Sequence, residues 1–68
     1  MLVHDQNFYD RRTGKRHNIS ITFECIATRL YTVWVDEEFH GYSKTMGEAF
    51  DKAAEVLKTT NWSPVKTV

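Results

Sequence analysis

The stretch SKTMGEAFDKAAEVLK (residues 43–58) decides the fold, because it has the start signal, the apolar stripe and the end signal of one amphipathic helix. Thr45 and Glu48 have the spacing of a capping box, in which each side chain binds the other residue's backbone N–H. The apolar stripe consists of Met46, Ala49, Phe50, Ala53, Ala54 and Leu57, with Val56 beside it. After the helix, Asn61 can adopt the left-handed conformation that ends helices, and Pro64 prevents continuation.

The residues before this helix predict antiparallel strands. Segment 17–25 alternates between apolar and polar residues, and segment 30–35 is rich in β-branched and aromatic residues. A short segment, 39–43, leads into the helix, and segment 2–9 predicts a weaker strand suited to a sheet edge. Because these segments follow one another closely, we expect them to pair as a meander.

The connections between these strands have turn chemistry. Asp10 and Gly14 favour a hairpin over residues 10–15, and we expect Gly14 at its position of positive φ. Residues 36–38 form an acidic turn, and Gly41 indicates a bulge or a close approach of the helix.

Together these elements predict one α+β, two-layer domain over residues 1–68. It is a three- to four-stranded antiparallel meander with the helix packed on one face. The tail, 60–68, has no regular period, so we expect it to be irregular. The residues expected to face the helix are Ile19, Ile21, Phe23, Cys25, Tyr31, Val33, Val35 and Phe39. Because one helix covers only one face, the opposite face is expected to be open and to carry Leu30 and Trp34.

Composition limits the classes of protein to which this chain can belong. Nine basic and nine acidic residues give zero formal charge, which argues against broad nonspecific attraction to phosphate. The single cysteine, Cys25, excludes an intrachain disulfide and a cysteine-rich zinc site, and it fits a reducing cytosol. The sequence has no long apolar run and no signal-peptide pattern. We therefore expect a soluble, cytoplasmic protein.

The small size of the chain favours a partner. A domain of 68 residues buries only about 60% of the surface that its unfolded chain exposes, so its core contributes little stability. A second copy that covers the open sheet face would relieve this problem, which makes a homodimer one expectation.

No pattern in the sequence indicates catalysis, a cofactor or a metal. The three histidines, His4, His17 and His40, lack the spacing of a metal pair and are expected on the surface. Cys25 alternates with core residues, so we expect a buried and inert thiol rather than a nucleophile. The chain also lacks a phosphate-binding glycine loop. We expect no enzyme activity and name no catalytic residue.

The predicted hairpin tip is the first candidate binding surface. Arg11, Arg12, Lys15 and Arg16 place four fixed cations within six residues, followed by His17. Such a tip can bind phosphate, or an acidic protein surface, through charge-assisted hydrogen bonds. The alternative is a charged loop that keeps the chain soluble and protects an edge strand.

The open sheet face is the second candidate. An exposed Trp34 beside Leu30 would be a suitable anchor for a protein partner. In the alternative, the tail folds back and covers Trp34 with Trp62, Val65 or Val68.

The ending YTVWVDEEFHGYSKTMGEAFDKAAEVL (residues 31–57) resembles two families. Its strand, turn, strand and T-x-x-E-A-x-x-x-A are similar to the β-β-β-α core of HicB-type antitoxins. The matching residues are Thr45, Glu48, Ala49 and Ala53. The C-terminal half of double-stranded-RNA-binding domains is also similar. Its matching residues are Ser43, Lys44, Ala49, Ala53 and Ala54.

Both resemblances consist largely of a helix cap and small packing residues. The RNA-binding resemblance departs further, because no N-terminal helix is predicted and residues 45–47 replace the expected phosphate-binding lysines. We assign the chain to neither family on this basis.

These observations predict a non-catalytic interaction protein that binds a larger macromolecular partner and regulates or inhibits it. Accessory proteins of phages and mobile elements, and antitoxins, are proteins of this kind. The alternative is a nucleic-acid-binding module that uses the basic hairpin, residues 11–16, with Tyr9 or Trp34 for stacking. Neither hypothesis involves a membrane.

Overall fold

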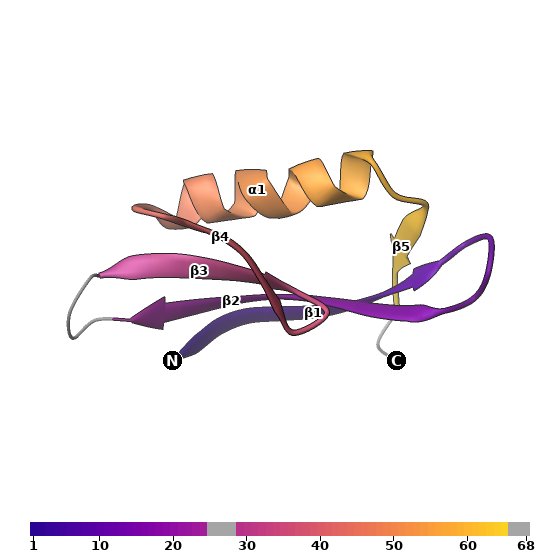
Figure 1. Cartoon of the computed structure of the whole chain (residues 1–68), viewed down its shortest axis with the longest axis horizontal. Helices are drawn as coiled ribbons and strands as arrows, with labels where there is room; N and C mark the ends of the chain where they lie inside the picture. The colour runs from indigo at the N-terminus through magenta and orange to yellow at the C-terminus, as the bar shows by residue number, and fades with distance from the viewer. Residues whose placement is uncertain (25–28, 66–68) are drawn as a thin grey trace.

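The computed structural model describes residues 1–24 and 29–65 and has two layers, a sheet and one helix (Figure 1). The elements are β1 (Leu2–Asp10), β2 (Arg16–Glu24), β3 (Leu30–Val35), β4 (Glu38–Ser43), α1 (Met46–Lys58) and β5 (Trp62–Pro64). The predicted α+β class, with an antiparallel sheet and one helix on one face, is confirmed. Cys25, which we expected to be buried, lies outside the described residues.

The sheet has five strands in the order β4-β3-β2-β1-β5, one more than the upper number predicted. The additional strand, β5, comes from the tail that we expected to be irregular, and it pairs antiparallel with the end of β1. Two backbone bonds flank this pairing: Arg11 N–H donates to Asn61 (2.9 Å) and Val65 N–H donates to Asn7 (3.0 Å). The C-terminal part of β1 therefore has a partner strand on both sides. Pro64 suits the outer strand, where a missing N–H is tolerated.

The core lies between the sheet and α1. Its buried apolar residues are Phe8, Ile19, Ile21, Val33, Ala49 and Ala53. Half-buried Phe23, Tyr31 and Val35 lie at predicted inward positions around them. The helix packs closely over β3 and β4, and a hollow remains between its other flank and β1. Phe50 lines this hollow, where it is 42% exposed and contacts the ring of His4 at a centroid distance of 4.9 Å.

The ends of α1 partly follow the prediction. Thr45 is the N-cap, and its hydroxyl accepts a hydrogen bond from Glu48 N–H at 3.2 Å. At the other end, the prediction that Asn61 adopts the left-handed conformation is wrong. Thr59 is the C-cap with φ −101°, and its N–H and hydroxyl both donate to the carbonyl of Val56. A threonine side chain therefore satisfies a carbonyl at this end without any left-handed residue.

A bulge in β4 corrects the prediction that Phe39 faces the helix. Val33 pairs with Gly41, but Trp34 pairs with Phe39, so His40 is an extra residue between the two pairs. Because an extra residue reverses the alternation of side chains, Phe39 joins Trp34 on the open face. The bulge that we expected near Gly41 is present, and the Lys52 side chain covers this glycine from the helix.

Two tight turns shape the ends of the sheet. Gly14 has φ +74°, as predicted, and its N–H donates to Asp10 O at 2.7 Å. The β3–β4 turn consists of two residues, Asp36 and Glu37, with φ +53° and +66°. Positive φ at both positions matches the twist of antiparallel hairpins, but it favours glycine, asparagine or aspartate. Glu37 is thus a poor residue for its position.

We expect Glu37→Gly to stabilise the protein by about 0.5–1 kcal/mol, because glycine removes the left-handed penalty but adds unfolded-chain entropy. The midpoint of thermal unfolding, followed by circular dichroism, should rise by a few degrees. Glu38→Gly is the matched control. Glu38 begins β4 without positive φ, so the same exchange there should destabilise the protein. Equal effects of the two substitutions would contradict the assignment of strain to Glu37.

Candidate interaction surfaces

The open face of the sheet carries a groove of about 340 Å³ on its β3–β4 side. The residues that line it are Glu24, Leu30, Thr32, Trp34, Phe39 and Tyr42. The pairing of the strands explains why these residues meet, since Thr32 lies opposite Tyr42 and Trp34 lies opposite Phe39. Figure 1 shows that no element of the described chain lies over this side of the sheet. Leu30 and Trp34 are therefore on the uncovered face, as the alternation predicted.

The aromatic side chains of this groove form one continuous group. Trp34 is half-buried, and its Nε1–H donates to Thr22 Oγ1 at 2.9 Å. Phe39 meets the Trp34 ring edge-on at a centroid distance of 6.2 Å, and Tyr42 follows Phe39 at 5.5 Å. Phe39 and Tyr42 are 56% and 58% exposed. The hydrogen bond fixes Trp34, whereas the other two rings present most of the accessible apolar area.

The described part of the tail does not cover Trp34. Residues 62–64 pair with β1, two strands away from β3, and Trp62 packs on the helix side against Phe8 at 6.3 Å. Val65 is tied by its N–H to Asn7, and Val68 lies outside the described residues. Of the two alternatives for Trp34, the described residues favour the uncovered one.

Phe39 and Tyr42 were missed as members of this surface. Simple alternation places Phe39 toward the helix and Tyr42 on the open face, so without Phe39 it does not indicate an aromatic group there. The signal that could have placed Phe39 is Gly41, because a glycine inside a short strand indicates a bulge. A bulge one residue before Gly41 puts both rings on the same face as Trp34.

The basic hairpin projects from the opposite end of the sheet. All four predicted cations, Arg11, Arg12, Lys15 and Arg16, are exposed. Arg11 also donates from Nε to the carbonyl of Asn61 at 3.1 Å, which ties the hairpin to the tail.

Asp10 gives this hairpin its shape. The Asp10 carboxylate accepts hydrogen bonds from the N–H groups of Arg12 (2.7 Å) and Thr13 (3.2 Å). The bond from Arg12 N–H, with the Arg12 charge nearby, lowers the pKa of Asp10. The loop thus combines a fixed negative charge at its base with cations at its tip.

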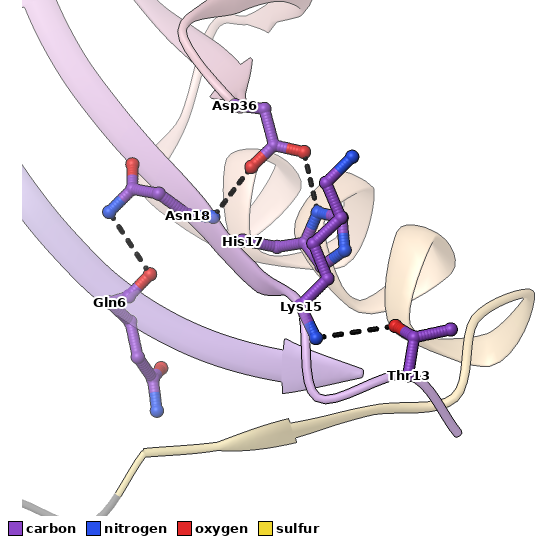
Figure 2. A network of polar contacts seen from close by, with 6 residues as sticks. All are labelled: Gln6, Thr13, Lys15, His17, Asn18 and Asp36. Carbon is purple, nitrogen blue, oxygen red and sulfur yellow. Dashed lines mark hydrogen bonds and ion pairs between the residues drawn. The ribbon is translucent and has the colours of Figure 1, made fainter. Parts of the chain in front are cut away.

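A polar cluster joins β2 to the β3–β4 turn (Figure 2). The Asp36 carboxylate accepts from Asn18 N–H and contacts His17 Nδ1, both at 2.8 Å. Partial burial raises the pKa of Asp36, but the hydrogen bonds from His17 and Asn18 outweigh it and lower the pKa below its ordinary value. The expectation of a surface His17 is wrong, because this ring is largely covered and stacks on Trp62 at 4.0 Å.

We expect Asp36→Asn to destabilise the protein by about 1 kcal/mol at pH 7, less than a buried charged pair because the Asp36 side chain is 43% exposed. Asparagine tolerates the same positive φ, so the lost charge dominates. Since the folded-state pKa is lowered, this stabilisation is present above the unfolded pKa of about 3.9 and is lost as pH falls through the folded value. Urea unfolding should show a difference in the free energy of unfolding between variant and wild type at pH 7. This difference should become small at pH 2–3. Asp51→Asn, with the same charge change on the exposed side of α1, is the control. A difference that persists at pH 2 would contradict this assignment.

Residues 1–24 and 29–65 contain no group of three histidine, cysteine, aspartate or glutamate side chains placed to hold a metal ion. Within the same residues, no helix is both long and apolar enough to cross a membrane. His4 and His40 lie on separate strands, with His4 against Phe50 and His40 exposed at the bulge.

Comparison with known proteins found no family model, no curated protein and no solved structure that matches this chain.

Proposed function

We propose that this chain is a small non-catalytic interaction protein that binds a larger protein partner through the open face of its sheet and regulates or inhibits that partner. The observation that carries this proposal is the uncovered aromatic group of Trp34, Phe39 and Tyr42 beside Leu30. Interfaces are enriched in tryptophan and tyrosine, which contribute large contact areas at low entropic cost. Inhibition by covering a surface requires no reacting group in the inhibitor.

The residues of the open face are expected to contribute unequally to binding. Leu30 and Trp34 form the half-buried floor of the groove, and Phe39 and Tyr42 form its exposed wall. Truncating an anchor that becomes fully desolvated costs about 2 kcal/mol or more in binding, whereas residues at the rim cost little. The largest losses of affinity are therefore expected when a groove residue that becomes fully buried in the complex is truncated.

The experiment is affinity capture from a lysate of the source cell, with nuclease-treated and untreated samples side by side. The tagged wild type is compared with Leu30→Ala/Phe39→Ala and, as a control of similar size on the helix side, Met46→Ala/Phe50→Ala. A specific protein should be retained after nuclease treatment by the wild type and the control, and lost from the groove variant. Recovery of nucleic acid alone, released by nuclease and salt, would overturn the proposal.

The second candidate function is nucleic-acid binding through the hairpin, residues 11–16. The observation that favours it is the exposure of four fixed cations on one projecting loop. Neutralising three to four phosphates would make the affinity fall steeply with salt, with a slope of about −3 on logarithmic axes. Arg12→Ala/Arg16→Ala should then weaken retention on an oligonucleotide column and flatten this slope. Unchanged retention would dismiss this function without affecting the first.

A further inference from the structure

The outer side of β4 is a free edge of the sheet. Within residues 1–24 and 29–65, β4 comes first in the order β4-β3-β2-β1-β5 and pairs only with β3. The opposite edge differs, because β5 covers the C-terminal part of β1. Proline and lysine protect many edge strands, but β4 contains neither, and four of its six residues are exposed. The outer backbone groups of β4 are therefore available to another strand.

The turn before β4 shows which backbone groups point outward. Residues 36 and 37 form a two-residue turn with positive φ at both positions, so Val35 and Glu38 are the hydrogen-bonded pair that closes it. Hydrogen-bonded and non-hydrogen-bonded pairs alternate along antiparallel strands, so the next pair, Trp34 with Phe39, is not hydrogen-bonded. The N–H and carbonyl of Phe39 therefore point to the free edge.

The bulge in β4 sets the second outward position. His40 is the extra residue, so hydrogen-bonded pairing with β3 resumes between Val33 and Gly41. Tyr42 follows, and its N–H and carbonyl again point outward. The rings of Phe39 and Tyr42 both lie exposed on the open face. The edge thus offers backbone hydrogen bonds and aromatic side chains at the same two positions.

We propose that a second copy of this chain adds to this edge, with β4 antiparallel to β4 across a two-fold axis. One symmetric register pairs both outward positions, because Phe39 of each copy then lies opposite Tyr42 of the other and the two bulges meet at the axis. Two aromatic cross-strand pairs form on the open face. The two five-stranded sheets become continuous, with both grooves on the same side.

The charges around β4 agree with the same register. It places Glu37 of each copy opposite Lys44 of the other, and Glu38 opposite Ser43, so no like charges meet. Glu37 and Lys44 are both exposed, and Arg16 lines a hollow together with Glu37. The new ion pair therefore selects the register and contributes little affinity. This complementarity of β4 with itself identifies the occupant as a second copy rather than an unrelated strand.

The experiment measures self-association and the exchange of single amides in the same samples. One short strand buries less area than a standard interface, so we expect a weak dimer, detected by sedimentation equilibrium between about 10 µM and 1 mM protein. As the concentration rises, the amides of Phe39 and Tyr42 should exchange more slowly with solvent, because the dimer gives them a hydrogen-bond partner. The amide of Gly47, in the first turn of α1, has no helical partner in either state and is the control.

Charge reversal tests the register. Glu37→Lys and Lys44→Glu should each raise the dissociation constant of the dimer about fivefold to tenfold at low salt, because each places like charges opposite one another at both ends of the pairing. The combined variant, Glu37→Lys/Lys44→Glu, should restore the affinity of the wild type. Glu38→Lys makes the same charge change opposite Ser43 and is the matched control.

The outcomes separate this inference from the proposed function. A chain that stays monomeric over the whole concentration range would overturn the dimer and leave the proposed function standing, because the groove is complete in one copy. A dimer with unchanged exchange at Phe39 and Tyr42, and with no larger response to Glu37→Lys than to Glu38→Lys, would also overturn it and would place the second copy on another surface.

Discussion

Replacing Ile21 by alanine is expected to lower the free energy of unfolding by about 2–4 kcal/mol. Ile21 is fully buried, and it lies between Val33 on β3 and His4 on β1, under the helix. Removing its branched side chain leaves a cavity that the paired strands cannot close. A domain of 68 residues has a total stability of only about 3–10 kcal/mol, so the loss is a large fraction of the whole.

Urea unfolding measures this effect as a lower midpoint with an unchanged slope. Leu2→Ala is the control, because Leu2 is 57% exposed and its truncation should change stability by less than about 0.5 kcal/mol. If Ile21→Ala unfolds completely, Ile21→Val should still be folded and lose about 0.5–1.5 kcal/mol. Similar losses of stability for Ile21→Ala and Leu2→Ala would contradict the assignment of Ile21 to the core.

Replacing Trp62 by alanine is expected to cost about 2–3 kcal/mol. The indole of Trp62 stacks on His17 at 4.0 Å, with the planes 12° apart, and contacts the ring of buried Phe8. It also begins β5, which extends the sheet beyond β1. The substitution therefore removes both an aromatic stack and the anchor of a short strand.

Trp34→Ala is the matched control for this prediction. Both tryptophans are half-buried, but Trp34 lies on the open face, where its truncation removes one hydrogen bond and little core packing. We expect a loss of about 1 kcal/mol there, measured by the same urea titration. A larger loss at Trp34 than at Trp62 would show that the open face belongs to the core.

The elements that the sequence predicted correctly have strong local causes. The helix follows from an apolar stripe behind a Thr45 cap, and residues 30–35 form β3 with the predicted bounds. The positive φ of Gly14 follows from the chemistry of its turn. Each of these depends on neighbours within a few residues, and for that reason periodicity and turn preferences identify them.

The features that the sequence did not predict depend on distant partners. Three residues such as 62–64 are too few to show alternation, and they form a strand because β1 offers unpaired backbone groups. The stack of Trp62 on His17 joins residues that have no sequence relation. Gly41 indicated a bulge in β4, but composition alone cannot tell which residue of a strand is the extra one, and that residue decides on which face Phe39 lies.

The position of β5 has a consequence for how the chain reaches its native state. The pairings of β1 with β2, β2 with β3 and β3 with β4 join neighbouring segments, whereas Phe8 must meet Pro64 from nearly the other end of the chain. Closing so long a loop is entropically costly, so the outermost strand would assemble after the meander and detach before it. Its amides would exchange with solvent hydrogen earlier than those of β2 and β3, and substitutions in β5 would accelerate unfolding without slowing refolding.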